Sequence, residues 1–180
     1  DGPWVAARTK ETALETTFPR LMLDHAKARP QAPALREKEY GIWQTTTWGE
    51  MAQQVQAMAC GLHQAGLQRG EHMVVIGANR PSLYATMLAA QSLGAIPVPL
   101  YQDAVAAECV FPINNADVRF AVVEDQEQVD KMLEVREQSP QLQHIFYDDP
   151  RGLRNYTEEG LGSLDELLAA GAVFAQQHPQ

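Results

Sequence analysis

Polar residues follow the apolar runs of this sequence, at positions where strands of an α/β sheet would end. Asn79 and Arg80 follow the run 73–78, and Tyr101 follows the run 96–100. Ligands of open α/β sheets bind beyond the carboxyl ends of the strands. We therefore predict a polar cleft with Asn79, Arg80 and Tyr101 on its rim as candidate substrate-binding residues. The same edge would carry five carboxylates, which are Asp103, Glu124, Asp125, Asp148 and Asp149.

Each of these positions also has a purely structural interpretation. We favour it over a role in ligand binding, because such structural roles are more common. Asn79 can cap a helix that begins at Pro81 and would leave Arg80 solvated. Tyr101 can close the edge of a core. Asp125 can cap a further helix, and the sequence Asp-Pro-Arg-Gly at 149–152 is typical of a turn. The paired carboxylates therefore do not predict a metal site.

The sequence contains no complete catalytic or nucleotide-binding motif. The run that ends at Ala78 offers only Gly77, whereas a phosphate-binding loop needs several glycines in fixed spacing after a strand. The five histidines form no i, i+4 pair and stand beside no nucleophile, so neither a zinc site nor a catalytic triad is indicated. Cys60 and Cys109 predict two reduced thiols. We predict no catalytic and no metal-binding residue in this segment.

The composition indicates a folded, acidic chain. Of its 180 residues, 45% are hydrophobic, and the net charge is -9. An acidic surface repels a phosphate backbone, so nucleic acid is not expected as a partner. No apolar run reaches the roughly 20 residues of a transmembrane helix, and the first residues do not resemble a secretory signal. Reduced cysteines favour a cytoplasmic location.

Helix and strand signals along the chain predict an α/β fold. A helix over 18–28 is capped by Thr17, a β-hairpin follows over 34–47, and the capping box from Thr47 to Glu50 opens a helix that ends at Gly66. Strands are predicted at 73–78, 96–100, 119–123 and 144–147. Helices are predicted between them at 81–93, 104–115 and 125–138. This order is typical of a three-layer, mostly parallel, doubly wound sheet with helices on both faces.

The chain is expected to divide into an arm, one partial domain and a tail. Residues 1–16 lack a sustained hydrophobic period and are interpreted as a flexible or docking arm. Residues 17–171 form the α/β domain, in which a capping box at 163–166 predicts a last helix that ends by Gly171. Residues 172–180 are interpreted as a truncated tail.

Several short segments carry a family resemblance. They include Leu67-Gln68-Arg69-Gly70-Glu71, Gly77-Ala78-Asn79-Arg80-Pro81 and Gly94-Ala95-Ile96-Pro97-Val98-Pro99-Leu100-Tyr101, with 32–36, 46–51, 59–62 and 122–128. Together they resemble the large N-terminal domain of adenylate-forming (AMP-binding) enzymes, and within that family the bacterial long-chain fatty acid–CoA ligases. The resemblance spans about 18–168. Two departures, Asp103 where the family usually has Thr and Pro112 in the next helix, leave the acyl-chain specificity open.

The resemblance implies an acid–thiol ligase as the parent protein. Such enzymes use ATP and Mg2+ to convert a fatty acid to an acyl-adenylate, and coenzyme A then takes the acyl group. The phosphate loop, the nucleotide motifs and the C-terminal lid lie later in such enzymes, so this incomplete segment is expected to be inactive and to bind none of these cofactors.

Further partners implied by the resemblance are the remainder of the same chain and a second copy that pairs through the N-terminal region. Peripheral association of the parent enzyme with a membrane stays open. Two alternatives to the long-chain ligase also stay open. One is a free-standing α/β binding or interaction module, and the other is a ligase for aromatic or shorter acids.

Overall fold

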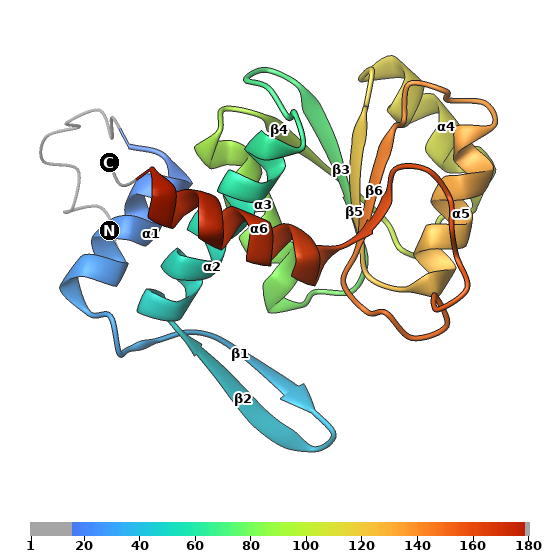
Figure 1. The fold of residues 1–180 in the computed structure, drawn as a ribbon. Helices are drawn as coiled ribbons and strands as arrows, with labels where there is room; N and C mark the ends of the chain where they lie inside the picture. Colours follow the sequence, from blue (N-terminus) through green and yellow to red (C-terminus); the bar gives the residue numbers. More distant parts are fainter. Residues whose placement is uncertain (1–15, 179–180) are drawn as a thin grey trace, which may run out of the picture.

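The computed structural model describes residues 16–178. They form a parallel sheet with helices on both faces, and a separate antiparallel hairpin projects from this body (Figure 1). The helices are α1 (Phe18–Ala28), α2 (Trp48–Gln64), α3 (Pro81–Ser92), α4 (Ala106–Asn115), α5 (Gln126–Arg136) and α6 (Leu164–Gln177). The strands are β1 (Pro33–Glu39), β2 (Ile42–Thr47), β3 (His72–Ile76), β4 (Ile96–Leu100), β5 (Phe120–Val123), β6 (His144–Tyr147) and β7 (Leu161–Ser163).

Local signals account for the first elements. The Thr17 side chain accepts a hydrogen bond from the Arg20 amide, and α1 covers the residues that the sequence predicts. The reciprocal capping box between Thr47 and Glu50 is present at the start of α2. Both devices satisfy amides that have no partner inside the helix, so the predicted helix starts are confirmed.

The sheet has the strand order β4-β3-β5-β6-β7, and all its neighbouring strands are parallel. The connection from β3 leads to β4 on one side, and the connection from β5 leads to β6 on the other. The strand order therefore reverses between β3 and β5, which is the position where doubly wound folds bind their ligands. The predicted fold class is confirmed.

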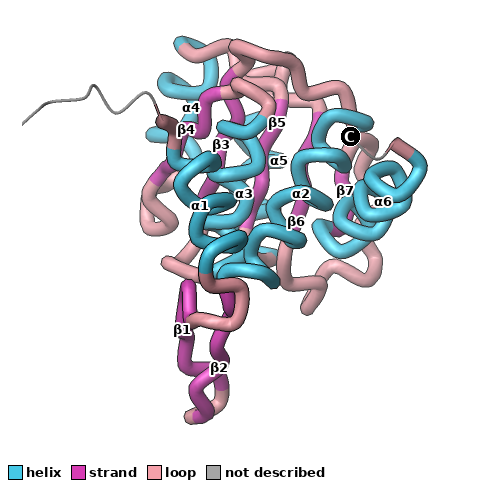
Figure 2. The backbone as a smooth tube through the Cα atoms, turned by 90° about the vertical axis from the view of Figure 1, so that its left-hand side faces the viewer, coloured by secondary structure: helices cyan, strands magenta, loops and turns pink. Residues whose placement is uncertain are grey.

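Helices cover both faces of this sheet (Figures 1 and 2). Met73 and Val75 of β3 belong to the core under α1, α2, α3 and α6, whereas Val74 and Ile76 belong to the core under α4 and α5. Alternate residues of a strand point to opposite faces, so a strand buried on both faces reads as an unbroken apolar run. Met51 and Met58 of α2 are buried in the first core, as predicted.

The end of the chain differs from the prediction in two ways. Residues 161–163 form a fifth parallel strand, β7, which the sequence analysis missed. The last helix does not end at Gly171 but continues to Gln177, because Gly171 lies within the close contact between α6 and α2. A glycine in such a contact serves packing and does not end the helix.

The predicted division into arm, domain and tail stays a prediction. Most of the predicted arm, residues 1–15, lies outside the described residues, as do residues 179 and 180. Among the helices that the structure describes, none is long and apolar enough to cross a bilayer.

Candidate functional site

A crevice of about 580 Å3 lies at the carboxyl ends of the strands, beside the β1–β2 hairpin. Its walls come from the hairpin, Gln54 of α2, the first turn of α3, the residue after β5 and the loop after β6. The residues that line it are Glu37, Lys38, Glu39, Tyr40, Thr46, Gln54, Arg80, Pro81, Ser82, Glu124, Asp148, Asp149, Pro150 and Arg151.

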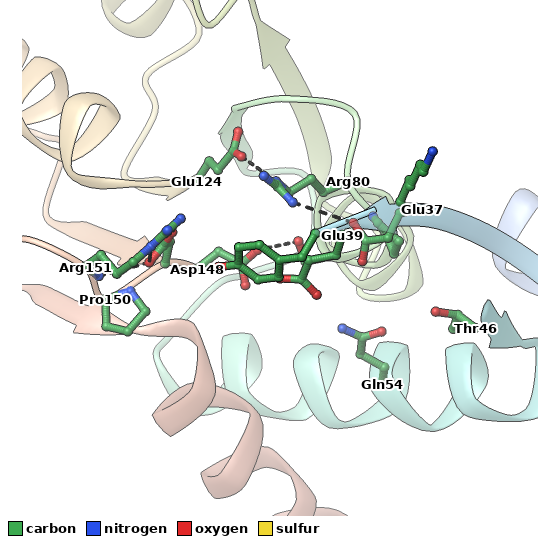
Figure 3. Close-up of a pocket in the computed structure, with 14 residues that line it drawn as sticks. Glu37, Glu39, Thr46, Gln54, Arg80, Glu124, Asp148, Pro150 and Arg151 are labelled. Carbon is green, nitrogen blue, oxygen red and sulfur yellow. Dashed lines mark hydrogen bonds and ion pairs between the residues drawn. The ribbon is translucent and has the colours of Figure 1, made fainter. Parts of the chain in front are cut away.

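Glu124 occupies the position where the strand order reverses. Its carboxylate accepts one hydrogen bond from the Ala78 amide and one from Arg80 Nε, each at 2.5 Å. Arg80 also lies 3.7 Å from Glu37 of the hairpin, so its guanidinium lies between two carboxylates (Figure 3). The hydrogen bond to Glu124 raises the pKa of Arg80 above its ordinary value, and the group stays a cation.

Gly77 allows this close approach of β3 to Glu124. Its φ of +156° lies in a region that side-chain-bearing residues rarely adopt, and a Cβ there would come within 2.6 Å of Glu124 Cβ. The close approach of Glu124 therefore accounts for a glycine at this position.

Asp148 and Asp149 are neighbours with opposite environments. Asp148 accepts a hydrogen bond from Ser82 Oγ at 2.5 Å, yet burial raises the pKa of its carboxyl above the ordinary value of 3.8. Asp149 is paired with Arg151, which lowers the pKa of the Asp149 carboxyl. The Arg151 amide also donates to Asp149, so the predicted turn at 149–152 is confirmed.

The crevice is polar, and only part of its charge is paired: five carboxylates and three cations line it, and Lys38, Glu39 and Asp148 form no salt bridge within residues 16–178. Arg80 pairs with Glu124 and Glu37, and Arg151 pairs with Asp149. No Ser, Thr or Cys next to a histidine base lines it, and residues 16–178 contain no group of three or more His, Cys, Asp or Glu side chains placed to hold a metal ion. The arrangement can orient a polar ligand.

The three predicted rim residues lie in two different hollows. Arg80 lines the crevice, whereas Asn79 and Tyr101 line a neighbouring cavity of about 690 Å3 at the ends of β3 and β4, together with Asp103. Their role as substrate-binding residues stays a prediction.

Three structural interpretations from the sequence are wrong. Arg80, not Asn79, is the N-cap residue of α3, and no side chain caps that helix. Tyr101 is 89% exposed and does not close a core. Arg80 is not simply solvated either, because it pairs with Glu124 and Glu37.

The sequence analysis did not identify the two carboxylates that pair with Arg80. Glu124 follows β5 and was noted only as one of several carboxylates, and the contribution of Glu37 from the hairpin was not anticipated. The carboxyl ends of neighbouring parallel strands lie close together. A cationic residue after one strand and an anionic residue after another is therefore the signal that could have indicated the Arg80–Glu124 pair. The Asp125 cap of α5, by contrast, is confirmed.

The two cysteines are free thiols, as predicted. Burial raises the pKa of the Cys109 thiol, which disfavours the reactive thiolate. His144 stacks between the rings of Phe120 and Phe146, and burial lowers the pKa of its imidazole. Cys109 packs in the core, whereas Cys60 and His144 are partly buried, and none of the three lines the crevice.

A protein-family model described as "AMP-binding enzyme" matches residues 22–173 of this chain. The chain belongs to this family. The predicted family is therefore confirmed. Uncharacterized protein Rv1549 of Mycobacterium tuberculosis is 32% identical over 147 residues, which are 81% of this chain and 81% of that protein. Long-chain-fatty-acid–CoA ligase FadD15 of Mycobacterium bovis is 25% identical over 164 residues, which are 88% of this chain and 27% of that ligase.

Solved structures of this family share the fold. Acetoacetyl-CoA synthetase from Streptomyces lividans superposes with a TM-score of 0.75 at 22% identity, over 84% of this chain and 25% of that one. The anthranilate CoA ligase AuaEII superposes with a TM-score of 0.73 at 17% identity, over 84% of this chain and 27% of that one. The chain thus spans about a quarter of each solved AMP-binding enzyme named here, but most of the length of Rv1549.

Proposed function

We propose that this chain is the N-terminal α/β segment of an ATP-dependent long-chain fatty acid–CoA ligase. The parent reaction converts fatty acid, ATP and CoA to acyl-CoA, AMP and pyrophosphate through an acyl-adenylate. The observation that carries the proposal is the match to FadD15, which extends over 88% of this chain. Ligases of the ACSBG2 type from mouse and frog match as well, at 29% and 28% identity.

The proposed contribution of this segment is structural. It supplies the crevice at the strand ends, while the groups that bind ATP, Mg2+ and CoA belong to the remainder of the enzyme. The lining of the crevice supports this division, because it includes no Ser, Thr or Cys beside a histidine base. We propose that the chain alone is inactive and binds none of these cofactors. A cytoplasmic location, peripheral membrane contact and pairing of two copies through the N-terminal region are further parts of this proposal.

Activity assays test the proposal at two levels. The chain alone, incubated with ATP, Mg2+, palmitate and CoA, is expected to release no AMP and to form no thioester. A chimera in which residues 16–178 replace the matching segment of FadD15 is expected to form palmitoyl-CoA, whereas FadD15 without that segment is not. A chimera that folds, as judged by circular dichroism, and yet makes no acyl-adenylate would contradict the proposed role.

A free-standing binding or interaction module is the second candidate. The match to Rv1549 favours it, because that protein is covered over 81% of its length and so has a similar size. This candidate predicts that the natural gene product ends near the size of this chain. Mass spectrometry of the protein from its native cells measures that size directly, and a product several times larger excludes the module.

A ligase for a different acid is the third candidate. It is favoured by solved structures whose titles name acetoacetyl-CoA synthetase, anthranilate CoA ligase and coronafacic acid ligase, because all share the fold of this segment. The natural full-length enzyme distinguishes the acids. Faster thioester formation with palmitate than with anthranilate or acetoacetate supports the long-chain assignment, and the reverse order contradicts it.

A further inference from the structure

The β4–α4 loop, residues 101–105, forms one wall of the cavity of about 690 Å3 at the ends of β3 and β4. Tyr101, Gln102 and Asp103 of this loop line the cavity together with residues of α3. The loop begins with a turn, in which the Ala104 amide donates to the Tyr101 carbonyl at 3.1 Å. Because β4 is an edge strand, the sheet supports it on one side only. The position of the loop therefore depends on the other elements that contact it.

Helix α5 makes such a contact through the Gln102 carbonyl. Lys131 Nζ donates a hydrogen bond to this oxygen, and Gln128 Nε2 donates a second one at 3.4 Å. Lys131 also donates to Gln128 Oε1 at 2.8 Å, which aligns the two side chains. Gln128 is buried, with 5% of its surface exposed, and its own amide is held by the Asp125 cap. One turn of α5 thus supplies two donors to one backbone oxygen of the loop.

Lys131 differs from an ordinary surface lysine in its surroundings. No salt bridge joins it to an Asp or Glu of residues 16–178, so its charge is directed to the two oxygens of Gln102 and Gln128. A hydrogen bond from a charged donor is roughly twice as strong as one between neutral groups. Lys131 is half-buried, and the lower local dielectric constant strengthens the bond further. This bond is therefore the strongest polar contact between α5 and the loop.

Helix α5 holds a second loop in a similar way. The Tyr156 hydroxyl, in the loop before β7, donates to Asp130 Oδ1 at 2.6 Å and accepts a bond from Gln126 Nε2 at 3.0 Å. None of these three residues lines the cavity. The contact at Tyr156 therefore provides a control, because its loss loosens a loop on the same helix without touching the cavity wall.

We propose that Lys131 is a positioning residue for the cavity, because it holds the 101–105 loop in the place where Tyr101 and Asp103 line the hollow. Lys131 does not line the cavity itself and acts through the Gln102 carbonyl. When the loop leaves this place, fewer molecules have a complete cavity, and the apparent affinity for a ligand there falls by the same fraction. The link to a ligase substrate rests on the proposed function, whereas the link to the loop does not.

Hydrogen exchange in the 180-residue chain, followed by NMR, tests the link to the loop. The Ala104 and Val105 amides report on the loop, because each donates a hydrogen bond within it or to the start of α4. Lys131→Met keeps the length of the side chain but removes its charge and its donors, so exchange at both amides is expected to be roughly tenfold faster. Lys131→Arg keeps a cationic donor and is expected to restore most of the protection. Unchanged exchange at both amides in Lys131→Met overturns the proposal.

Two comparisons separate a local effect from a general loss of stability. Tyr156→Phe removes the hydroxyl contact of the other loop and is expected to leave exchange at Ala104 and Val105 unchanged. The amides of β5, in the middle of the sheet, are expected to exchange in Lys131→Met as they do in the unmodified chain. If exchange rises as much in β5 as in the 101–105 loop, or if Tyr156→Phe has the same effect on this loop, the positioning role is overturned.

Kinetics of the FadD15 chimera test the link to a substrate. In the chimera, Lys131→Met is expected to raise the KM for at least one of palmitate, ATP and CoA roughly tenfold, while kcat changes by less than about twofold. Lys131→Arg is expected to restore that KM. Unchanged KM values for all three substrates, or a fall in kcat alone, overturn the positioning role. If the unmodified chimera is itself inactive, the proposed function is contradicted instead, and hydrogen exchange alone decides the role of Lys131.

Discussion

The helices that cover the two faces of the sheet differ in how far apart they lie in the sequence. The second face is covered by α4 and α5, which belong to one stretch, 106–136. The first face is covered by α1, α2, α3 and α6, so it joins the beginning of the chain to its end. The first face therefore depends on contacts between distant residues, whereas the second is assembled from near neighbours. The crevice lies at the strand ends between the two faces.

On the first face, α2 and α6 approach each other closely. A Cβ at position 171 would lie 1.9 Å from the Ala57 carbonyl oxygen, and a Cβ at Gly61 would lie 2.4 Å from the Leu167 carbonyl oxygen. Backbone atoms cannot yield as a flexible side chain can. The two glycines thus let the last helix lie directly against the second, which closes the first face.

Gly171→Val is the substitution with the largest expected effect. The added side chain forces α6 away from α2 and should lower the free energy of unfolding by about 3 kcal/mol or more. Urea denaturation followed by circular dichroism measures this loss. The control is Ala170→Val, an exposed position on the same helix, which should cost about 0.5 kcal/mol through helix propensity. Equal losses in the two variants would show that α6 is not closely packed on α2.

The same contrast explains which elements the sequence could predict. The side chains of Thr17, Thr47 and Asp125 each accept a hydrogen bond from the amide three residues ahead, so a short stretch of sequence around each contains the whole signal. Residues 161–163 form a strand only because β6 lies beside them. Gly171 reads as a helix end locally, and only its contact with Ala57 shows otherwise.

The candidate site was predictable in position but not in its pairing. The topology rule places a cleft at the strand ends, and the crevice is there. The pairing of Arg80 with Glu124 depends on β3 and β5 being neighbours, which a separation of 44 residues in the chain conceals. The contribution of Glu37 depends on where the hairpin lies against the sheet. Neither contact can be predicted from a short stretch of neighbouring residues.

The helix starts after β3 and β5 offer a matched comparison between the two faces. Asp125 accepts a hydrogen bond from the Gln128 amide and caps α5 on the second face. Asn79 makes no cap for α3 on the first face. Asp125→Ala should therefore cost about 1 kcal/mol of unfolding free energy, whereas Asn79→Ala should change it by less than about 0.5 kcal/mol. Thermal and urea denaturation of the two variants, side by side, measure the difference.

A different outcome would alter the assignment of Asn79. If Asn79→Ala costs as much as Asp125→Ala, Asn79 does stabilise the start of α3 in solution, and its role on the rim is structural. If its stability is unchanged while ligand binding by the parent enzyme weakens, the predicted role as a substrate-binding residue gains support.

The smallest expected effects are those of Asp148 and Asp149 on how stability depends on pH. The two effects have opposite signs. Burial raises the pKa of Asp148, while Asp165 of α6 and Glu124 add repulsion. The folded state then holds its proton to higher pH than the unfolded state does. Asp148 therefore lowers stability as the pH rises from its ordinary value of 3.8 through its raised pKa. Asp149 behaves in the reverse way, because Arg151 lowers its pKa and the stability it contributes is lost as the pH falls.

Melting curves of Asp148→Asn and Asp149→Asn between pH 3 and pH 7 test this difference. At pH 7, Asp148→Asn should be more stable than the unmodified chain, by less than about 1 kcal/mol because part of the carboxylate remains solvated. The advantage should disappear below the ordinary pKa, where Asp148 is protonated in both states. Asp149→Asn should instead be less stable at pH 7 and approach the unmodified chain in acid. If both variants shift in the same direction at pH 7, burial does not dominate the environment of Asp148, and the approach of α3 and α6 to the end of β6 is looser than described.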